Sequence, residues 1–263
     1  MPSSPGNSPI VLVERQGAVA TVSLNRPERR NALNYELISA LHRTMADLGS
    51  DETVRAVVLT GSGKSFCAGL DLRELGSTGD NLLKVGAFAG ETGPWDRLSK
   101  PVVGAVNGPA VTGGLEIALH CDFLIASDRA RFGDTHARVG VLPGWGLSYL
   151  LPQAVGVRRA REMSLTGRLV GAAEALRWGL VNRIVAADEL IDTACAVAAT
   201  MAETDPAIAA EFLTLYADNV SGTIAAASER ETERSTAWAD RVFKPELVAQ
   251  RADAVIERGR AQA

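Results

Sequence analysis

One stretch of the sequence, residues 101–126, restricts the possible folds more than any other. It reads PVVGAVNGPAVTGGLEIALHCDFLIA. Residues 102–106 are a short apolar, β-branched run that predicts a buried strand, and the Asn-Gly-Pro at 107–109 ends it. Residues 115–119 predict a helix, and residues 122–126 predict a second buried strand. The stretch therefore predicts a strand, a glycine-containing turn, a helix and another strand, which is the repeating unit of an α/β protein.

A glycine pair, Gly113 and Gly114, stands where this helix begins. Glycine has no Cβ, so the backbone N–H groups stay open at the positive end of the helix dipole, where they can hold a negatively charged oxygen. Glu116 lies in the same first turn. A glutamate there often only favours the dipole or completes a capping box, but Gly113 stands where the box needs Ser or Thr. Both interpretations of Glu116, as a cap and as a functional group, stay open at this point.

A second small-residue turn follows another predicted buried strand, residues 54–60. It reads FCAGLDL over 66–72, and its Ala68-Gly69 pair would let backbone N–H groups approach a ligand closely; an ordinary tight turn is the alternative. The preceding GSGKS at 61–65 is similar to a phosphate-binding loop, but that motif needs glycine where Val58 stands. No GxGxxG segment is present either. We therefore do not expect a nucleotide site here.

Strand–turn–helix units recur along the chain, which predicts a largely parallel sheet with helical crossovers. Ligands of such folds bind at the carboxyl ends of the strands, so the two glycine turns can meet in one site. A hairpin is expected over residues 10–24, an amphipathic helix over 32–48 and an irregular loop or helical excursion over 73–98. Further helices are expected over 156–165, 171–178, 187–202, 206–218 and 225–258, with a short strand at 181–185.

Composition excludes several classes of protein. The chain has 263 residues with 46% hydrophobic content, enough for a full core, and its net charge is −4 with scattered Lys and Arg, which argues against a nucleic-acid or membrane-surface partner. Three widely spaced cysteines and three dispersed histidines predict a reducing compartment and no metal site. Residues 1–9 lack a signal-peptide pattern and are expected to be a disordered tail, and no stretch is apolar enough to span a membrane. A cytoplasmic protein is expected.

Taken together, these segments resemble the enoyl-CoA hydratase/isomerase (crotonase) superfamily. The resemblance covers nearly the whole chain. It rests on LNRP at 24–27 with NAL at 31–33, on FCAGLDL, on residues 100–122, and on FG at 132–133 followed by GVLPG at 140–144. The resemblance implies an α/β fold of the ClpP/crotonase type, a repeated ββα spiral with a helical C-terminal region. It implies a crotonase core over 10–198 and a helical region over 199–263 that builds homotrimers or hexamers made of two trimers.

The resemblance also implies roles for particular residues. In that family two backbone N–H groups hold the thioester oxygen of an acyl-CoA, and the matching residues are Ala68 and Gly113. Glu116 matches the glutamate that deprotonates the attacking water. The residues assigned to CoA binding are Arg26, Ala68, Gly69, Leu70 and Asp71. Lys244, next to Phe243, is a weaker match to a lysine that approaches a CoA phosphate. No cofactor is expected, because CoA is part of the substrate.

One departure from the family pattern concerns a second glutamate. Hydratases usually carry it after the Phe-Gly, and an ungapped alignment puts His136 there. Three interpretations follow: His136 acts as acid or base, since the ordinary imidazole pKa of about 6.5 suits that task; Glu116 makes both proton transfers; or His136 only lines the pocket or bonds to Asp134. Nearby, Trp145 is interpreted as packing the loop rather than walling the acyl pocket.

The expected function is that of an enoyl-CoA hydratase-like lyase. The loss of the second glutamate argues against a typical Δ3-Δ2 isomerase, whose base lies at that position. The alternatives are another crotonase-type reaction that uses His136, such as decarboxylation, isomerisation or thioester hydrolysis, and a non-catalytic acyl-CoA-binding protein.

Overall fold

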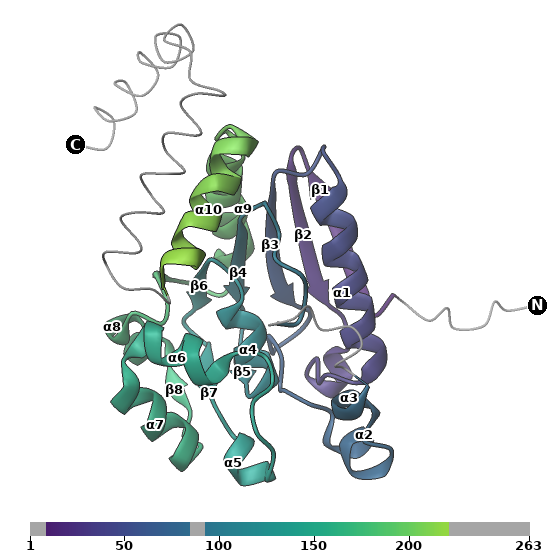
Figure 1. Cartoon of the computed structure of the whole chain (residues 1–263), viewed down its shortest axis with the longest axis vertical. Helices are drawn as coiled ribbons and strands as arrows, with labels where there is room; N and C mark the ends of the chain where they lie inside the picture. The colour runs from purple at the N-terminus through teal and green to yellow at the C-terminus, as the bar shows by residue number, and fades with distance from the viewer. Residues whose placement is uncertain (1–8, 85–92, 221–263) are drawn as a thin grey trace, which may run out of the picture. The chain divides into compact units, whose positions relative to one another are not determined.

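The computed structural model describes residues 9–84 and 93–220 (Figure 1). Contacts divide the chain into two compact units, Met1–Ala210 and Glu211–Ala263. Three expectations therefore lie outside the described residues: the tail at 1–9 apart from Pro9, the helix over 225–258, and the placement of Lys244 near a CoA phosphate.

The main sheet has six strands in the order β1-β2-β3-β4-β6-β9. They are β1 (Val11–Gln16), β2 (Val19–Leu24), β3 (Ala56–Gly61), β4 (Val102–Val106), β6 (Phe123–Ser127) and β9 (Arg183–Val185). β1 and β2 form the expected antiparallel hairpin, and every other neighbouring pair is parallel. The prediction of a largely parallel sheet is confirmed.

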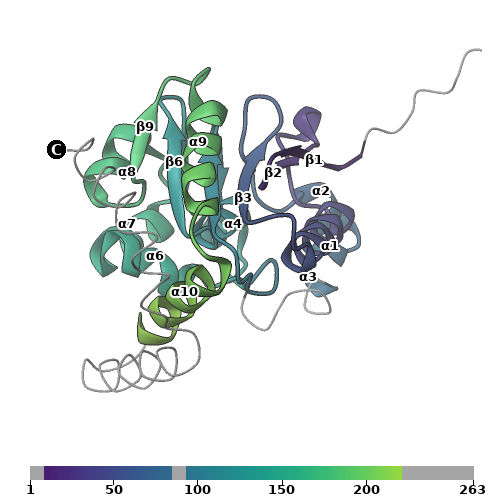
Figure 2. The same cartoon turned by 90° about the horizontal axis from the view of Figure 1, so that it is seen from above.

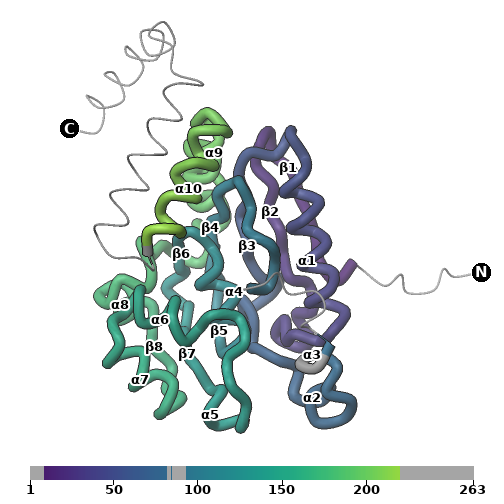
Figure 3. Tube along the Cα trace, in the orientation of Figure 1, coloured from purple at the N-terminus to yellow at the C-terminus, as the bar shows by residue number. Residues whose placement is uncertain are grey.

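A second sheet of three short strands runs in the order β5-β7-β8, namely β5 (Pro109–Val111), β7 (Arg131–Gly133) and β8 (Val170–Gly171). β4 and β6 of the main sheet each continue into a strand of this second sheet and then into a helix, as the trace of β4, β5 and α4 shows in Figure 3. That succession is the expected ββα repeat. The short strands themselves were not predicted, because two or three residues carry no hydrophobic period.

The described helices are α1 (Tyr35–Ser50), α2 (Leu72–Ser77), α3 (Asp80–Leu83), α4 (Gly113–Leu119), α5 (His136–Val139), α6 (Leu147–Val155), α7 (Val157–Thr166), α8 (Ala172–Trp178), α9 (Leu190–Ala202) and α10 (Pro206–Val220), with a 3-10 turn at Pro27–Arg29. Helix α1 begins three residues later than expected because Asn34 caps it. The Asn34 side-chain oxygen accepts from the Leu37 N–H at 3.0 Å, which satisfies an end group of the helix.

Helices cover both faces of the main sheet. The side chains of α9 at positions 190, 194, 198 and 202 are all buried and are spaced by four, so they form one stripe. Figure 2 shows helix α9 lying over the main sheet. On the other face, α1 buries Leu37, Leu41, Met45 and Leu48, as its periodicity predicted. The boundary expected at residue 198 falls inside α9, whose stripe belongs to the core of the first unit.

Candidate active site

The two glycine-containing turns lie against each other at the ends of β3 and β5. The Cys67 N–H donates to the Pro109 carbonyl at 3.0 Å, and the Val111 N–H donates to the Cys67 carbonyl at 2.9 Å. A Cβ added at Gly114 would lie only 2.2 Å from the Cys67 carbonyl oxygen. Any larger residue at 114 would push α4 away from the first turn, so the glycine sets the spacing between the two turns.

Two backbone N–H groups face the space between these turns. The Gly113 N–H opens α4, and no described residue supplies an acceptor for it. The same holds for the Leu70 N–H within the described part of the chain. The two groups are neighbours, because a Cβ added at Gly113 would lie 3.9 Å from the Leu70 nitrogen. Together they can donate to one anionic oxygen.

The predicted donor Ala68 is wrong, because its N–H donates to the Arg30 carbonyl at 3.1 Å. The local pairing explains the shift to Leu70. Leu33 pairs with this turn: its N–H donates to the Gly69 carbonyl at 2.8 Å, and its carbonyl accepts from the Asp71 N–H at 2.9 Å. Alternate residues of an extended chain point their N–H groups to opposite sides, so the Leu70 N–H is left facing away from Leu33.

Thr112, just before Gly113, has a strained backbone. Its φ is +56° with ψ −115°, a conformation that β-branched residues rarely adopt. Its N–H donates to the Gly133 carbonyl at 2.8 Å, and its hydroxyl lies 2.6 Å from the hydroxyl of Thr135 and accepts from the Thr135 N–H at 3.0 Å. Strain of this kind persists only where its surroundings hold it, and here the contacts come from β7 and the residues after it.

Glu116 is buried beside these donors, with 3% of its surface exposed. Its Oε1 accepts from the backbone N–H of Trp145 at 2.8 Å. Burial raises the pKa of Glu116, and the N–H of Trp145 and the nearby His136 offset part of that rise. A buried carboxyl with a raised pKa next to oxyanion donors suits proton transfer better than helix capping.

His136 opens α5 and is also buried, at 4% exposure. Its Nδ1 lies 2.7 Å from Asp134 Oδ1, and because a carboxylate only accepts, Nδ1 carries the hydrogen. Its Nε2 faces Glu116 Oε2 at 3.6 Å. Burial alone would raise the pKa of Asp134, but hydrogen bonds from His136 and Ser164 lower it. The imidazole of His136 therefore lies between two carboxyl groups: it is hydrogen-bonded to Asp134, and its other nitrogen faces Glu116.

Arg26 and Asp71, both assigned to CoA binding, contact each other. Arg26 Nη2 lies 3.2 Å from Asp71 Oδ2, and Arg26 also donates to the Ala32 carbonyl. Asp71 caps α2 by accepting from the Arg73 N–H at 3.1 Å. Burial would raise the pKa of Asp71, but its hydrogen bonds to Arg26 and Arg73 lower it. The pair holds the turn that contains Leu70.

Sequence reasoning missed the role of the Trp145 backbone. The indole is buried in the main core cluster, as the packing interpretation expected. The N–H of Trp145, however, holds Glu116 together with the N–H of Leu147, and 29 residues separate Trp145 from Glu116. The sequence shows a glycine on each side of Trp145, but this pattern does not predict which backbone group faces the site.

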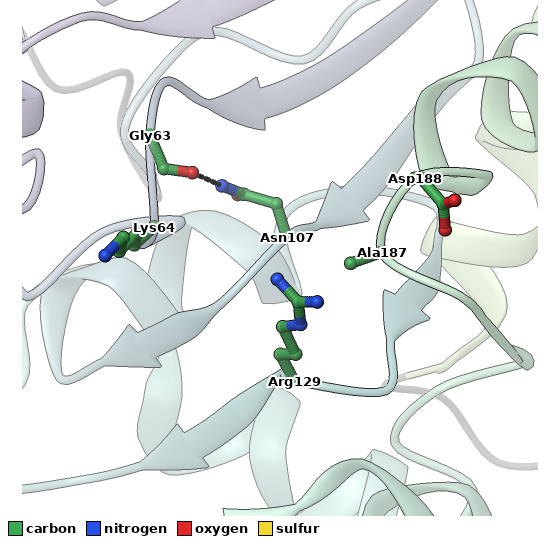
Figure 4. A pocket seen from close by; sticks show the side chains of 6 residues that line it. All are labelled: Gly63, Lys64, Asn107, Arg129, Ala187 and Asp188. Atoms are coloured by element: carbon green, nitrogen blue, oxygen red, sulfur yellow. Dashed lines mark hydrogen bonds between the residues drawn. The ribbon is translucent and has the colours of Figure 1, made fainter.

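A separate surface pocket of about 680 Å³ is lined by Gly63, Lys64, Asn107, Arg129, Ala187 and Asp188 (Figure 4). None of the predicted site residues lines it. The Asn107 side-chain amide is already used, because it donates to the carbonyls of Gly61 at 2.7 Å and Gly63 at 3.0 Å. The pocket therefore lies apart from the site at Glu116 and contributes no residue to it.

Neither a metal-binding cluster nor a membrane-spanning helix occurs among the described residues. No group of three or more His, Cys, Asp or Glu side chains there is arranged to hold a metal ion. No helix in that part of the chain has the length and apolar character needed to cross a membrane.

Comparisons with known proteins give a consistent result. The profile of the enoyl-CoA hydratase/isomerase family matches residues 14–241. A probable peroxisomal enoyl-CoA hydratase of Arabidopsis thaliana is 36% identical over 87% of this chain and 86% of its own length. A probable enoyl-CoA hydratase of Rhizobium meliloti is 43% identical over 73% of this chain and 75% of its own. The crystal structure of an enoyl-CoA hydratase from Mycobacterium tuberculosis matches with a TM-score of 0.72 at 44% identity, covering 88% of this chain and 94% of that one.

Proposed function

Because the chain belongs to the enoyl-CoA hydratase/isomerase family, we propose that it adds water to the double bond of an enoyl-CoA thioester. One observation carries the proposal: the start of α4 brings together the buried carboxyl of Glu116 and the N–H groups of Leu70 and Gly113, for which no described residue supplies an acceptor. Hydration needs a base for water and donors for a developing oxyanion, and these groups supply both.

In the proposed reaction, Glu116 takes a proton from water and the water oxygen bonds to the β-carbon. The electron pair of the double bond moves toward the thioester, whose oxygen becomes the negative end of an enolate. The N–H groups of Leu70 and Gly113 donate to that oxygen, and losing one such donor typically costs about 10²–10³ in rate. A proton then bonds to the α-carbon, which completes the addition of one water molecule.

We propose that His136 supplies the proton to the α-carbon. In its protonated form, one N–H is held by Asp134 and the other, at Nε2, is free beside Glu116. After Nε2 has given its proton to the α-carbon, the proton that Glu116 took from water returns to the imidazole. The 3.6 Å separation between His136 Nε2 and Glu116 Oε2 supports this return step. The pair would thus replace the two glutamates of typical hydratases.

CoA binding along residues 68–71 and near Arg26 is part of the same proposal, with no cofactor besides the CoA that the substrate carries. The contact between Arg26 and Asp71 supports it, because a fixed turn keeps the Leu70 N–H aimed at the thioester oxygen. Since the charge of Arg26 is already matched by Asp71, we expect Arg26 to hold the turn more than to neutralise a phosphate.

The test follows the loss of enoyl-thioester absorbance when a short enoyl-CoA is added. Glu116→Gln removes the base but keeps the side-chain shape, so its kcat should fall at least about 10²-fold. The matched control is Glu14→Gln, since Glu14 is exposed on β1, and it should turn over at the wild-type rate. Normal turnover by Glu116→Gln would refute the assignment of the base.

A second candidate function is favoured by the pairing of Asp134 with His136. An imidazole held by a carboxylate can activate water against the thioester carbonyl, which would release CoA thiol and a free acid. Product analysis across a panel of acyl-CoAs decides: a hydroxyacyl-CoA product supports hydration, and free CoA supports hydrolysis. Binding of acyl-CoA without any product would indicate a non-catalytic protein.

We propose that the protein assembles as a homotrimer or as a hexamer of two trimers. On α10, Phe212 and Tyr216 are 54% and 70% exposed and their rings are 6.2 Å apart, which suits burial against another copy. Light scattering should give the mass of three or six chains, and a monomer would contradict the proposal.

We further propose that the protein works in a reducing compartment, the cytoplasm, because Cys67, Cys121 and Cys195 are all free thiols.

A further inference from the structure

His120 follows α4, one turn after Glu116, on the same side of the helix. Its Nε2 lies 2.7 Å from the carbonyl oxygen of Trp145. A carbonyl only accepts hydrogen bonds, so Nε2 is the donor. The backbone N–H of the same tryptophan donates to Glu116 Oε1 at 2.8 Å. One helix face therefore holds residue 145 at two points, once through its carbonyl and once through its N–H.

The surroundings keep the His120 ring in that orientation. The ring of Trp95 meets it edge-on with 6.1 Å between centroids. A Cβ at Gly93 would lie 2.4 Å from the His120 Cε1, so the backbone of residue 93 also packs on the ring. Burial lowers the pKa of His120, which favours the neutral form with its single hydrogen on Nε2.

The residues just before Trp145 have little packing of their own. Leu142 is 86% exposed, and a Cβ at Gly144 would meet nothing within 4 Å. The buried Trp145 is followed at once by Gly146, which has a φ of +87°. The position of the Trp145 peptide group is therefore set by the buried indole on one side and by the hydrogen bond from His120 on the other.

We propose that His120 is a positioning residue for the reaction: by holding the Trp145 carbonyl, it fixes the Trp145 N–H that orients the carboxyl of Glu116. With Oε1 held in this way, Oε2 is the oxygen that faces His136. His120 touches neither the substrate nor the reacting atoms in this scheme. The inference rests on the proposed role of Glu116 as the base.

The experiment compares two substitutions of His120 in the full-length protein with the enoyl-CoA assay. His120→Met keeps the bulk but removes the donor, and because a misplacement of about 1 Å can cost about 10²-fold, kcat should fall about 10- to 100-fold with KM within about twofold. His120→Gln keeps an N–H donor and should recover most of that loss. The control is His42→Met, because His42 lies on α1 and its buried Nδ1 has no hydrogen-bond partner among the described residues; this variant should leave both constants unchanged.

A pH profile adds a readout that a general loss of packing would not move. The Trp145 N–H lowers the pKa of Glu116, so loosening it in His120→Met should move the acidic limb of kcat/KM to higher pH. The groups that also act on Glu116 are His136, Asp134 and the Leu147 N–H, and all are unchanged in this variant.

The outcomes separate the inference from the function on which it rests. If Glu116→Gln is inactive while His120→Met keeps its kcat, the positioning role is refuted and the proposed function stands. If kcat of His120→Gln falls as far as kcat of His120→Met, the hydrogen bond to the Trp145 carbonyl does not position Glu116, and the inference is refuted. If Glu116→Gln is fully active, the proposed base is wrong whatever the His120 variants do. Should His120→Met not fold, the comparison passes to His120→Asn, whose shorter amide cannot reach the carbonyl, against His120→Gln.

Discussion

Replacing His136 by Asn separates its two contacts. The Asn amide can still donate to Asp134, as Nδ1 of the imidazole does at 2.7 Å, but it has no atom at the Nε2 position 3.6 Å from Glu116. It also cannot carry a proton. A general acid or base contributes about 10²–10⁴ in rate, which at about 1.4 kcal/mol per tenfold is about 3–5 kcal/mol of barrier. We expect kcat of His136→Asn to fall by that factor.

The stability of the same variant should change little, because Asp134 keeps a donor. His136→Ala leaves that carboxylate buried, with 2% of its surface exposed and its imidazole partner gone. Asp134 would keep the backbone N–H of residue 136 and Ser164 as donors, and the loss of one donor to a buried carboxylate costs about 1–3 kcal/mol, so the Ala variant should unfold at lower urea concentration.

The assays are turnover of a short enoyl-CoA and equilibrium unfolding in urea. We expect a stable, nearly inactive Asn variant and a less stable, inactive Ala variant. A stable His136→Asn that turns over within about threefold of wild type would show that the imidazole transfers no proton. In that case Glu116 would make both transfers and His136 would only hold Asp134.

Two further predictions concern Glu116 and Asn31. Burial raises the pKa of Glu116 above its usual 4.5, and a general base works only when it is unprotonated. A pH profile of kcat/KM should therefore fall toward low pH with a midpoint above 4.5. A midpoint at or below 4.5 would contradict the assignment of Glu116 as the base. Asn31 is fully buried with a φ of +55°, and its amide donates to the carbonyls of Ser65 at 2.8 Å and Phe66 at 3.2 Å. Asn31→Ala should therefore lower the free energy of unfolding by about 1–3 kcal/mol in urea, and an unchanged midpoint would show that these bonds add nothing net.

The sequence predicted the main sheet well because its strands carry strong local patterns. Residues 102–106 form β4 as expected, since an apolar, β-branched run bounded by Pro and Asn-Gly leaves few alternatives. The meeting of the two glycine turns also followed from local rules, because parallel strands bring their carboxyl ends to one edge. Glu116 was found for the same reason, because it follows such a strand, whereas His136 was found only from the resemblance to the family.

What the sequence could not predict depends on pairing between distant segments. Whether Ala68 or Leu70 offers its N–H is decided by the bridge to Leu33, more than thirty residues earlier in the chain. The orientation of the Glu116 carboxyl depends on a hydrogen bond from the backbone N–H of Trp145. The type of side chain at position 145 does not predict where the peptide group of that residue lies. Patterns of side chains report burial, whereas these contacts belong to backbone atoms that every residue shares.

The hydroxyl contact between Thr112 and Thr135 restricts which substitutions the site can accept during evolution. Thr112 precedes the donor Gly113, and Thr135 precedes His136, so one contact links the backbone at both functional groups. A substitution at 135 would release a residue held at positive φ and disturb the oxyanion donor as well as the imidazole. Positions 112, 135 and 136 should therefore be replaced together, as a set, in any descendant of this protein that exchanges its acid for another group.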